Sequence, residues 1–240
     1  MSHRKIILFI VEGSTDEEAL SYCTSRFFHS VKNEVVFEVV RGDLTSKKGV
    51  SPKNVTETVV SLVKGVLSQK RWMPKDLRAI YQITDTDGVF VSDTMVVEDL
   101  EAQDIIYTED HIRYKNREVV LSRNQRKASN LRILYKKRKI TLNKVEIPYR
   151  ILYMSSCLEH VTANKLNCSI EEKVELAESF LEKFDEDVPG FVNFFRNSDF
   201  SVKLDYSDSW DFIQKDCNSL KRHTNFGMLF EDCIDSGEFK

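Results

Sequence analysis

The fold is decided by residues 6–17, which have the sequence IILFIVEGSTDE. Six consecutive apolar residues, four of them β-branched, are typical of a fully buried strand. Glu12 and Gly13 follow, and Ser14 or Thr15 is a suitable cap for a helix that we expect over 15–29. Open α/β sheets bind ligands outside the carboxyl ends of their strands. Glu12 therefore stands where a functional site is expected.

A second acidic motif follows a later apolar run. Residues 79–88 have the sequence AIYQITDTDG and place Asp85 and Asp87 just after a predicted strand. In an extended chain, side chains two residues apart point the same way, so both carboxylates are expected to reach one ion. Converging carboxylates repel one another unless a cation lies between them. Mg²⁺ and Mn²⁺ prefer such oxygen ligands. The alternative is a pair of solvated turn carboxylates.

Strand and helix patterns alternate along the first part of the chain. This alternation predicts a parallel sheet with right-handed crossovers. After Gly88 we expect a short hairpin over 107–121, a basic helix over 122–137 and a further strand over 147–154. The other predicted strands are 5–11, 35–40 and 77–84, and the other predicted helices are 53–69, 158–165, 170–184, 190–195, 210–218 and 226–234.

The charges of this 240-residue chain are strongly segregated, although its net charge is only −3. Residues 113–150 contain thirteen Lys or Arg and two acids, whereas residues 159–240 contain nine and eighteen. Surface helices normally mix both signs, so the basic block favours contact with nucleic-acid phosphates over an ordinary solvated face. The residues expected to contact nucleic acid are Arg123, Arg126, Lys127 and Arg132, with Lys47 and Lys48 from the loop after the second strand.

The composition excludes several other classes of protein. Apolar and charged fractions of 41% and 30% are those of an ordinary soluble globule. No apolar run is long enough for a membrane span, and the first residues do not have the pattern of an export signal. Five scattered cysteines without a CxxC pair argue against zinc or a disulfide framework. We therefore expect a cytoplasmic protein that does not contact the membrane.

The two acidic motifs together resemble the Toprim domain. The string Glu12-Gly13-x-Thr15-Asp16-Glu17 is most similar to the nuclease branch, which includes OLD-like and phage-defence Toprim proteins. The resemblance covers roughly residues 4–155. It implies an α/β fold, a Toprim-like (Rossmann-like) parallel sheet flanked by helices, over residues 1–155. This domain would carry a basic insertion at about 107–146, and residues 156–240 would form a helical C-terminal region.

The resemblance also implies roles for individual residues. Glu12 would be the general acid/base or a metal ligand, Asp85 and Asp87 would bind Mg²⁺ or Mn²⁺, and Asp16 would be a further ligand. Glu17 is a weaker candidate, because acids are common at helix N-termini. Glu159 and His160 are also candidates, since they follow the predicted strand 147–154. The alternative for these two is a helix N-terminal Glu beside a surface His.

By resemblance, the chain is expected to be a metal-dependent nuclease that hydrolyses phosphodiester bonds in RNA or DNA. A stand-alone Toprim nuclease suits a toxin-like effector of phage defence (abortive infection). The chain has no Gly-x-x-x-x-Gly-Lys-Ser/Thr motif, so an ATPase or sensor partner would be a separate chain. The alternative is a non-catalytic nucleic-acid-binding Toprim module, a scaffold in a repair or defence complex. The type of nucleic acid and the oligomeric state stay open.

Overall fold

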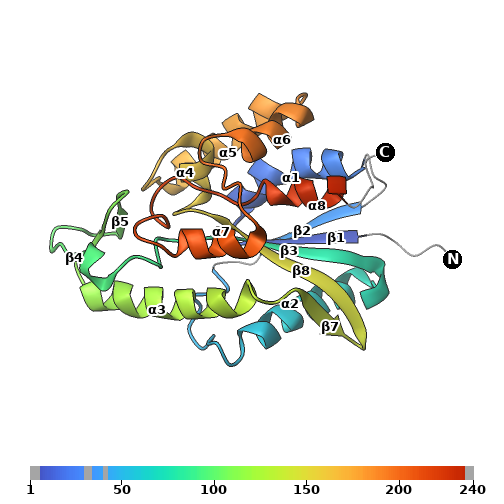
Figure 1. Ribbon diagram of the computed structural model, residues 1–240, viewed down its shortest axis with the longest axis horizontal. Coiled ribbons are helices and arrows are strands. Elements are labelled where there is room, and N and C mark those ends of the chain that lie inside the picture. The colour runs from blue at the N-terminus through green and yellow to red at the C-terminus, as the bar shows by residue number, and fades with distance from the viewer. Residues whose placement is uncertain (1–5, 30–33, 40–42, 236–240) are drawn as a thin grey trace.

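A five-stranded sheet forms the centre of the computed structural model, which describes residues 6–29, 34–39 and 43–235. Four strands are parallel and the last is antiparallel to its neighbour. Helices cover both faces of the sheet (Figure 1). The chain is therefore an α/β protein with a mostly parallel sheet, an arrangement compatible with a Rossmann-like fold. The strand order is β2 (Glu34–Val39), β1 (Ile6–Val11), β3 (Leu77–Asp85), β8 (Val145–Met154) and β7 (Lys139–Leu142).

The apolar run of β1 is buried along its whole length because both faces of the sheet are covered. Helix α1 (Ser14–His29) lies on one side of the sheet, with α5 (Ile170–Phe184), α6 (Val188–Asn197) and α8 (Met228–Asp235). On the other side lie α2 (Val55–Lys70) and α3 (Arg117–Leu134) (Figure 1). This double coverage explains why β1 has no alternation of apolar and polar residues.

The register of the parallel strands brings their carboxyl ends to one edge. Leu8 of β1 pairs with both Val36 and Ile80, and Asp85 at the end of β3 pairs with Met154 at the end of β8. Residues that directly follow β1, β3 and β8 must therefore lie near one another. This edge is where a ligand is expected in an open α/β sheet.

A small second sheet and α3 separate β3 from β7 and β8 in the chain. The second sheet has the order β4 (Val96–Glu98), β6 (Ile112–Tyr114) and β5 (Ile106–Tyr107), and it lies at one end of the molecule (Figure 1). Two 3₁₀ turns, η1 (Pro74–Asp76) and η2 (Asp93–Met95), precede β3 and β4. The second sheet has its own apolar cluster, which includes Ile112, Val120 and Leu220. Leu220 thus ties the C-terminal region to this sheet.

The C-terminal residues are helical and pack on the main core. Besides α5, α6 and α8, they form α4 (Leu158–Ala163) and α7 (Tyr206–Ile213). One continuous apolar cluster joins β1 and α1 to Phe180, Phe191 and Phe226. Among the described residues, no helix has both the length and the apolar character needed to cross a membrane.

Most predicted elements are present, and the differences have local causes. Segment 117–121, predicted to belong to a hairpin, is the first turn and a half of α3. Its apolar residues suggested a strand, but the Asn116 side chain accepts a hydrogen bond from the Val119 N–H and caps the helix. The hairpin is only β5 and β6, and β7 was not predicted. Helix α7 begins four residues earlier than expected. Of the predicted segments, Lys5, Val40 and the loop residues 41–42 lie outside the described residues.

Candidate functional site

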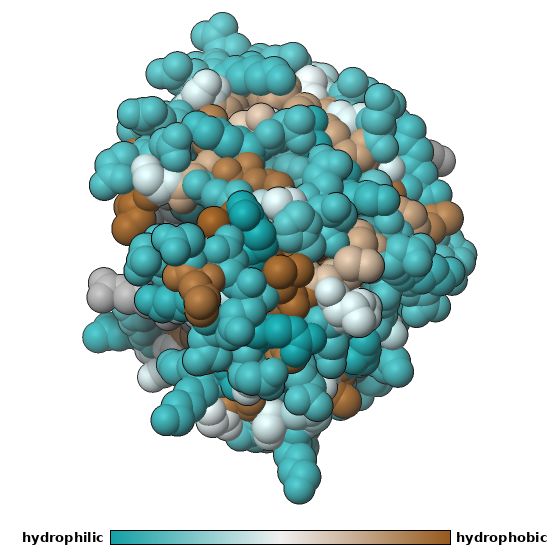
Figure 2. Space-filling view, turned by 90° about the vertical axis from the view of Figure 1, so that its left-hand side faces the viewer, coloured by the Kyte–Doolittle hydropathy of each residue, from teal (hydrophilic) through white to brown (hydrophobic). Residues whose placement is uncertain are grey.

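Six carboxylates gather at the carboxyl edge of the parallel strands. Each comes from a residue at or just after the end of a strand, or from the first turn of the helix that follows. Figure 2 views the molecule from the end at which the small sheet lies, and this end is mostly hydrophilic with small separate apolar patches. A site here suits a charged ligand better than an apolar one. The six residues are Glu12, Asp16, Asp43, Asp85, Asp87 and Glu159.

One buried lysine holds three of these carboxylates. The Lys127 side chain from α3 is 0% exposed, and its Nζ lies 2.6 Å from Asp87 Oδ2 and 2.7 Å from Asp43 Oδ2. Glu12 Oε1 is 3.7 Å from the same nitrogen and accepts a hydrogen bond of 2.5 Å from the Thr84 hydroxyl. Residues that follow β1, β2 and β3 are thus joined through one cation.

Asp87 does not have the extended backbone that its spacing from Asp85 suggested. Its φ is +48°, so the chain turns at this residue, and its side chain lies against Lys127. Thr86 fixes the turn: its N–H donates to the Met154 carbonyl at 2.9 Å, and its hydroxyl accepts from the Ser156 N–H at 2.8 Å. The extended backbone that the prediction for Asp85 and Asp87 assumed is therefore absent, because the strand ends at Asp85.

The remaining three carboxylates have fewer cations and hydrogen-bond donors around them than the three that contact Lys127. Glu159, in the first turn of α4, has one oxygen 3.2 Å from Lys173 Nζ. Its other oxygen, Oε2, is buried without a hydrogen-bond partner. Asp16 accepts a hydrogen bond of 2.9 Å from the Gly13 N–H. Asp85 has no ion pair with any described residue, and its charge interacts with those of Asp16 and Glu159. Around Asp16, Asp85 and Glu159, the negative charges at this edge therefore outweigh the positive ones.

The imbalance appears in the pKa values of the carboxyl groups. Burial, aided by the charges of Asp43 and Asp87, raises the pKa of Glu12 to about 8 although Lys127 opposes the shift. Burial and the neighbouring acids raise the pKa of Asp85 well above its ordinary value, and burial raises that of Asp16 to about 6.

Lys127 lowers the pKa of Asp43, which it contacts as closely as it contacts Asp87. Burial alone would raise the pKa of Asp43, but Lys127 and the hydrogen bonds from Thr45 hold it at about 2. Burial would likewise lower the pKa of Lys127, yet its three carboxylates raise that pKa well above the ordinary value. Lys127 is therefore a permanent internal cation.

The weaker acidic candidates lie at the margin of this cluster. Glu17 is half-buried and lines an open cavity of about 660 Å³ together with Glu12 and Glu38. His160 is buried, not on the surface as the alternative reading had it, and its Nδ1 has no hydrogen-bond partner. Burial lowers the pKa of His160, and its charged neighbours include Glu109 and Arg222 rather than the acids of the cluster.

The basic residues predicted to bind nucleic acid have different environments. Lys127 is fully buried among carboxylates, so the prediction of a surface phosphate contact is wrong for this residue. Arg123 donates to the Tyr107 hydroxyl at 2.5 Å and to the Asp87 carbonyl at 3.2 Å. Arg126 donates to the Ser46 carbonyl and Arg132 to Gln214, both at 2.8 Å. Lys47 and Lys48 are exposed.

Sequence reasoning missed four residues that shape the site. Asp43 follows β2, so the strand-end argument that found Glu12 and Asp85 would also have found it. Thr84 could have been suspected as the polar residue before Asp85. Lys173 and Tyr107 gave no usable signal, because they reach the site only through the packing of α5 and of the small sheet.

The donor set fits a hard divalent cation in its chemistry. All six groups are carboxylates, the ligands that Mg²⁺ and Mn²⁺ prefer, and Glu159 has a buried oxygen without a partner. As the described side chains stand, no three of Asp, Glu, His or Cys are close enough together to hold an ion. An ion would thus require the carboxylates around Asp85 to turn toward a common point.

Comparison of the chain with protein-family models, with curated proteins and with solved structures finds no match.

Proposed function

We propose that the chain is a Toprim-type nuclease that uses Mg²⁺ or Mn²⁺ to hydrolyse phosphodiester bonds in RNA or DNA. The observation that carries this proposal is Asp85. It ends the central strand, where burial and the neighbouring acids raise its pKa, and it forms no ion pair with a described cation. Lys173, which pairs with Glu159 at 3.2 Å, compensates this carboxylate cluster only in part. Such a cluster at the ligand edge of an α/β sheet is suited to a divalent ion bound to a phosphate.

The residues divide into three roles. Asp16, Asp85 and Glu159 are the groups that would hold the ion, because Asp43 and Asp87 already contact Lys127. Glu159 pairs with Lys173 through Oε1, so it would bind the ion through its unpartnered Oε2. When bound, a divalent ion polarises the phosphodiester and stabilises the leaving oxygen. Glu12, with a pKa of about 8, can hold or release a proton near neutral pH, as a general acid or base must. Lys127 fixes Glu12 and Asp87 in place.

The biological setting that we propose is that of a cytoplasmic phage-defence effector. A protein that cuts cellular nucleic acid harms its own cell unless it is restrained. A separate ATPase or sensor chain is therefore the partner that we propose for it.

The test is cleavage by the purified protein. Transfer RNA, long RNA, single-stranded DNA and plasmid are each incubated with Mg²⁺, Mn²⁺ or EDTA. We expect metal-dependent cleavage that Asp85→Asn abolishes and that Asp104→Asn, which changes an exposed acid outside the cluster, leaves intact. Equal cleavage by wild type and Asp85→Asn would refute the assignment.

A second function is favoured by a different observation. Lys127 satisfies three carboxylates without any metal, as a structural ion-pair network would. A non-catalytic nucleic-acid-binding module, a scaffold in a repair or defence complex, needs no more than this. It predicts salt-sensitive binding of nucleic acid and no cleavage with any metal or partner.

A further inference from the structure

The basic residues of segment 113–150 form two groups with different surroundings. In the first three turns of α3, every cation has a partner inside the molecule. These contacts join α3 to the loops around it, so these side chains are occupied by structural bonds. The contacts are Arg117 to the Val96 and Asp93 carbonyls, Arg123 to Tyr107, Arg126 to the Ser46 carbonyl, and Lys127 to its carboxylates.

The second group is open to solvent. Between Arg132 and Lys144 the chain has six basic residues and no acid. Lys136, Lys137, Lys139 and Lys144 are exposed, and we call them the distal basic face. Lys139 pairs with Glu146 at 2.6 Å, whereas the other three have no ion pair with a described residue. Their positive charge is therefore available to an external anion.

The distal basic face extends away from the acidic cluster. Strand β8 runs ten residues from Val145, next to Lys144, to Met154, which pairs with Asp85. At about 3.3 Å per residue, Lys144 lies roughly 30 Å from the acidic edge. Lys136 and Lys137, in the segment between α3 and β7, lie between the two, because the Tyr149 N–H in the middle of β8 donates to the carbonyl of the adjacent Arg138.

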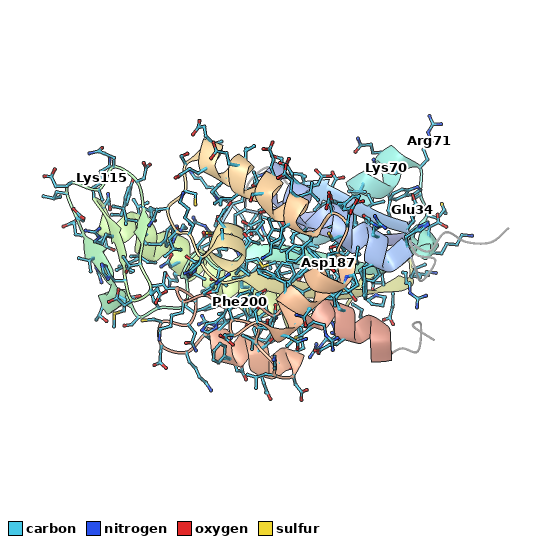
Figure 3. The ribbon with its side chains drawn as sticks, turned by 90° about the horizontal axis from the view of Figure 1, so that it is seen from above. Glu34, Lys70, Arg71, Lys115, Asp187 and Phe200 are labelled. Atoms are coloured by element: carbon cyan, nitrogen blue, oxygen red, sulfur yellow. The ribbon has the colours of Figure 1, made fainter. Side chains whose placement is uncertain are left out.

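Helix α2 continues this positive region. It packs against α3 and β7, and its Lys64 and Lys70 are exposed. Its C-terminal residues Lys70 and Arg71 lie at the opposite end of the molecule from Lys115, which sits on the small sheet (Figure 3).

We infer that the distal basic face binds the phosphate backbone of the substrate nucleic acid at a distance from the acidic cluster. This inference rests on the proposed function and narrows its substrate. A span of roughly 30 Å corresponds to about nine base pairs at 3.4 Å per pair. The substrate is then a duplex or a folded strand with helical stems of that length, not a short oligonucleotide.

The surroundings of the face favour nucleic acid over an anionic membrane. Proteins that lie on membranes insert apolar side chains beside their basic residues. Of the large hydrophobic residues that the described chain exposes, none lies between residues 120 and 150, and Met73 is the single one next to Lys70 and Arg71. The face therefore offers charge without an apolar anchor.

The experiment measures binding in EDTA, so its result does not depend on whether the protein cuts. Fluorescein-labelled RNA and DNA duplexes of 8 and 24 base pairs are titrated at several salt concentrations. The triple variant Lys136→Gln/Lys137→Gln/Lys144→Gln is compared with Lys115→Gln/Lys203→Gln/Lys215→Gln, which removes the same charge from exposed positions elsewhere. Thermal melting checks that both variants are folded, and vesicles with anionic lipid are a separate arm.

We expect wild type and the control triple to bind the 24-base-pair duplex much more tightly than the 8-base-pair duplex. The distal triple should lose about 100-fold in affinity for the longer duplex near 0.15 M salt, and its salt slope should fall by about 2 to 3, because three phosphate contacts are lost. Equal losses in both triples, no binding by wild type, or a distal-face effect on vesicles alone would each overturn the inference.

Discussion

Lys127 and its three carboxylates act as one electrostatic unit. The lysine is fully buried and lies within 2.7 Å of oxygens from both Asp43 and Asp87. Such a cation is tolerated only because its partners surround it. If it is removed, three acids at the ends of three strands lose their only common counter-charge.

The first prediction concerns this unit. Lys127→Met should lower the free energy of unfolding by about 3–5 kcal/mol, because it leaves buried carboxylates uncompensated. Urea unfolding at neutral pH in EDTA measures the change. The matched control is Lys137→Met, an exposed lysine for which we expect a change within about 0.5 kcal/mol. If both substitutions have the same small effect, the ion pairs of Lys127 with Asp43 and Asp87 do not stabilise the fold.

The second prediction concerns pH. The pKa of Glu12 is about 8 in the fold and near 4.5 in the unfolded chain, and that of Asp16 is about 6 in the fold against 3.8. Between these values the native state binds more protons, so stability should fall as pH rises from about 4 to 8. Glu12→Gln removes the contribution of Glu12 to this pH dependence. In EDTA, Glu12→Gln should raise the free energy of unfolding by on the order of 2–4 kcal/mol more at pH 8.5 than at pH 5.

The measurement for this prediction is urea unfolding of wild type and Glu12→Gln at both pH values. An effect of the substitution that is the same at pH 5 and pH 8.5 would show that Glu12 does not titrate abnormally.

At the scale of elements, the turn after β3 is the most constrained. Gly88 has a φ of +63°, and a Cβ there would lie 2.3 Å from Leu220 Cδ2. Gly88→Ala should therefore cost about 2–4 kcal/mol through strain and overpacking. Gly65 in the middle of α2 has open space around it, so Gly65→Ala should stabilise the protein by about 0.5–1 kcal/mol. Thermal or urea unfolding separates the two. Effects of the same sign would contradict this description of the turn.

The elements that the sequence predicted well are those with a strong apolar pattern. β1 and β3 are buried runs of the kind that only a covered sheet explains, and helix 170–184 matches its prediction at both ends. The errors occur where short-range pattern and tertiary packing disagree. Segment 117–121 has apolar residues suited to a strand, but Asn116 caps a helix and Val119 is left 52% exposed. β7 is only four residues long, too short for its pattern to stand out, and it forms by pairing with β8.

At the scale of the whole molecule, sequence motifs could locate the site but not its charge balance. Glu12, Asp16 and Asp85 meet because parallel strands end at one edge, which the strand pattern implied. That Lys127 is buried among acids depends on how α3 crosses the sheet. In sequence, Lys127 lies in a basic run and is indistinguishable from the exposed lysines that follow. Asp87 leaves the strand direction because Thr86 is hydrogen-bonded to Met154 and Ser156, which are far from it in the sequence.

The most direct test of the account is the binding of Mn²⁺ to the protein alone, measured by isothermal titration calorimetry at pH 7.5. This measurement needs neither the substrate nor an activating partner. We expect saturable binding that is lost in Asp85→Asn and in Glu159→Gln, and kept in the surface control Asp104→Asn. Binding that is absent from wild type, or equal in wild type and Asp85→Asn, would contradict a metal site at the carboxyl edge of the sheet.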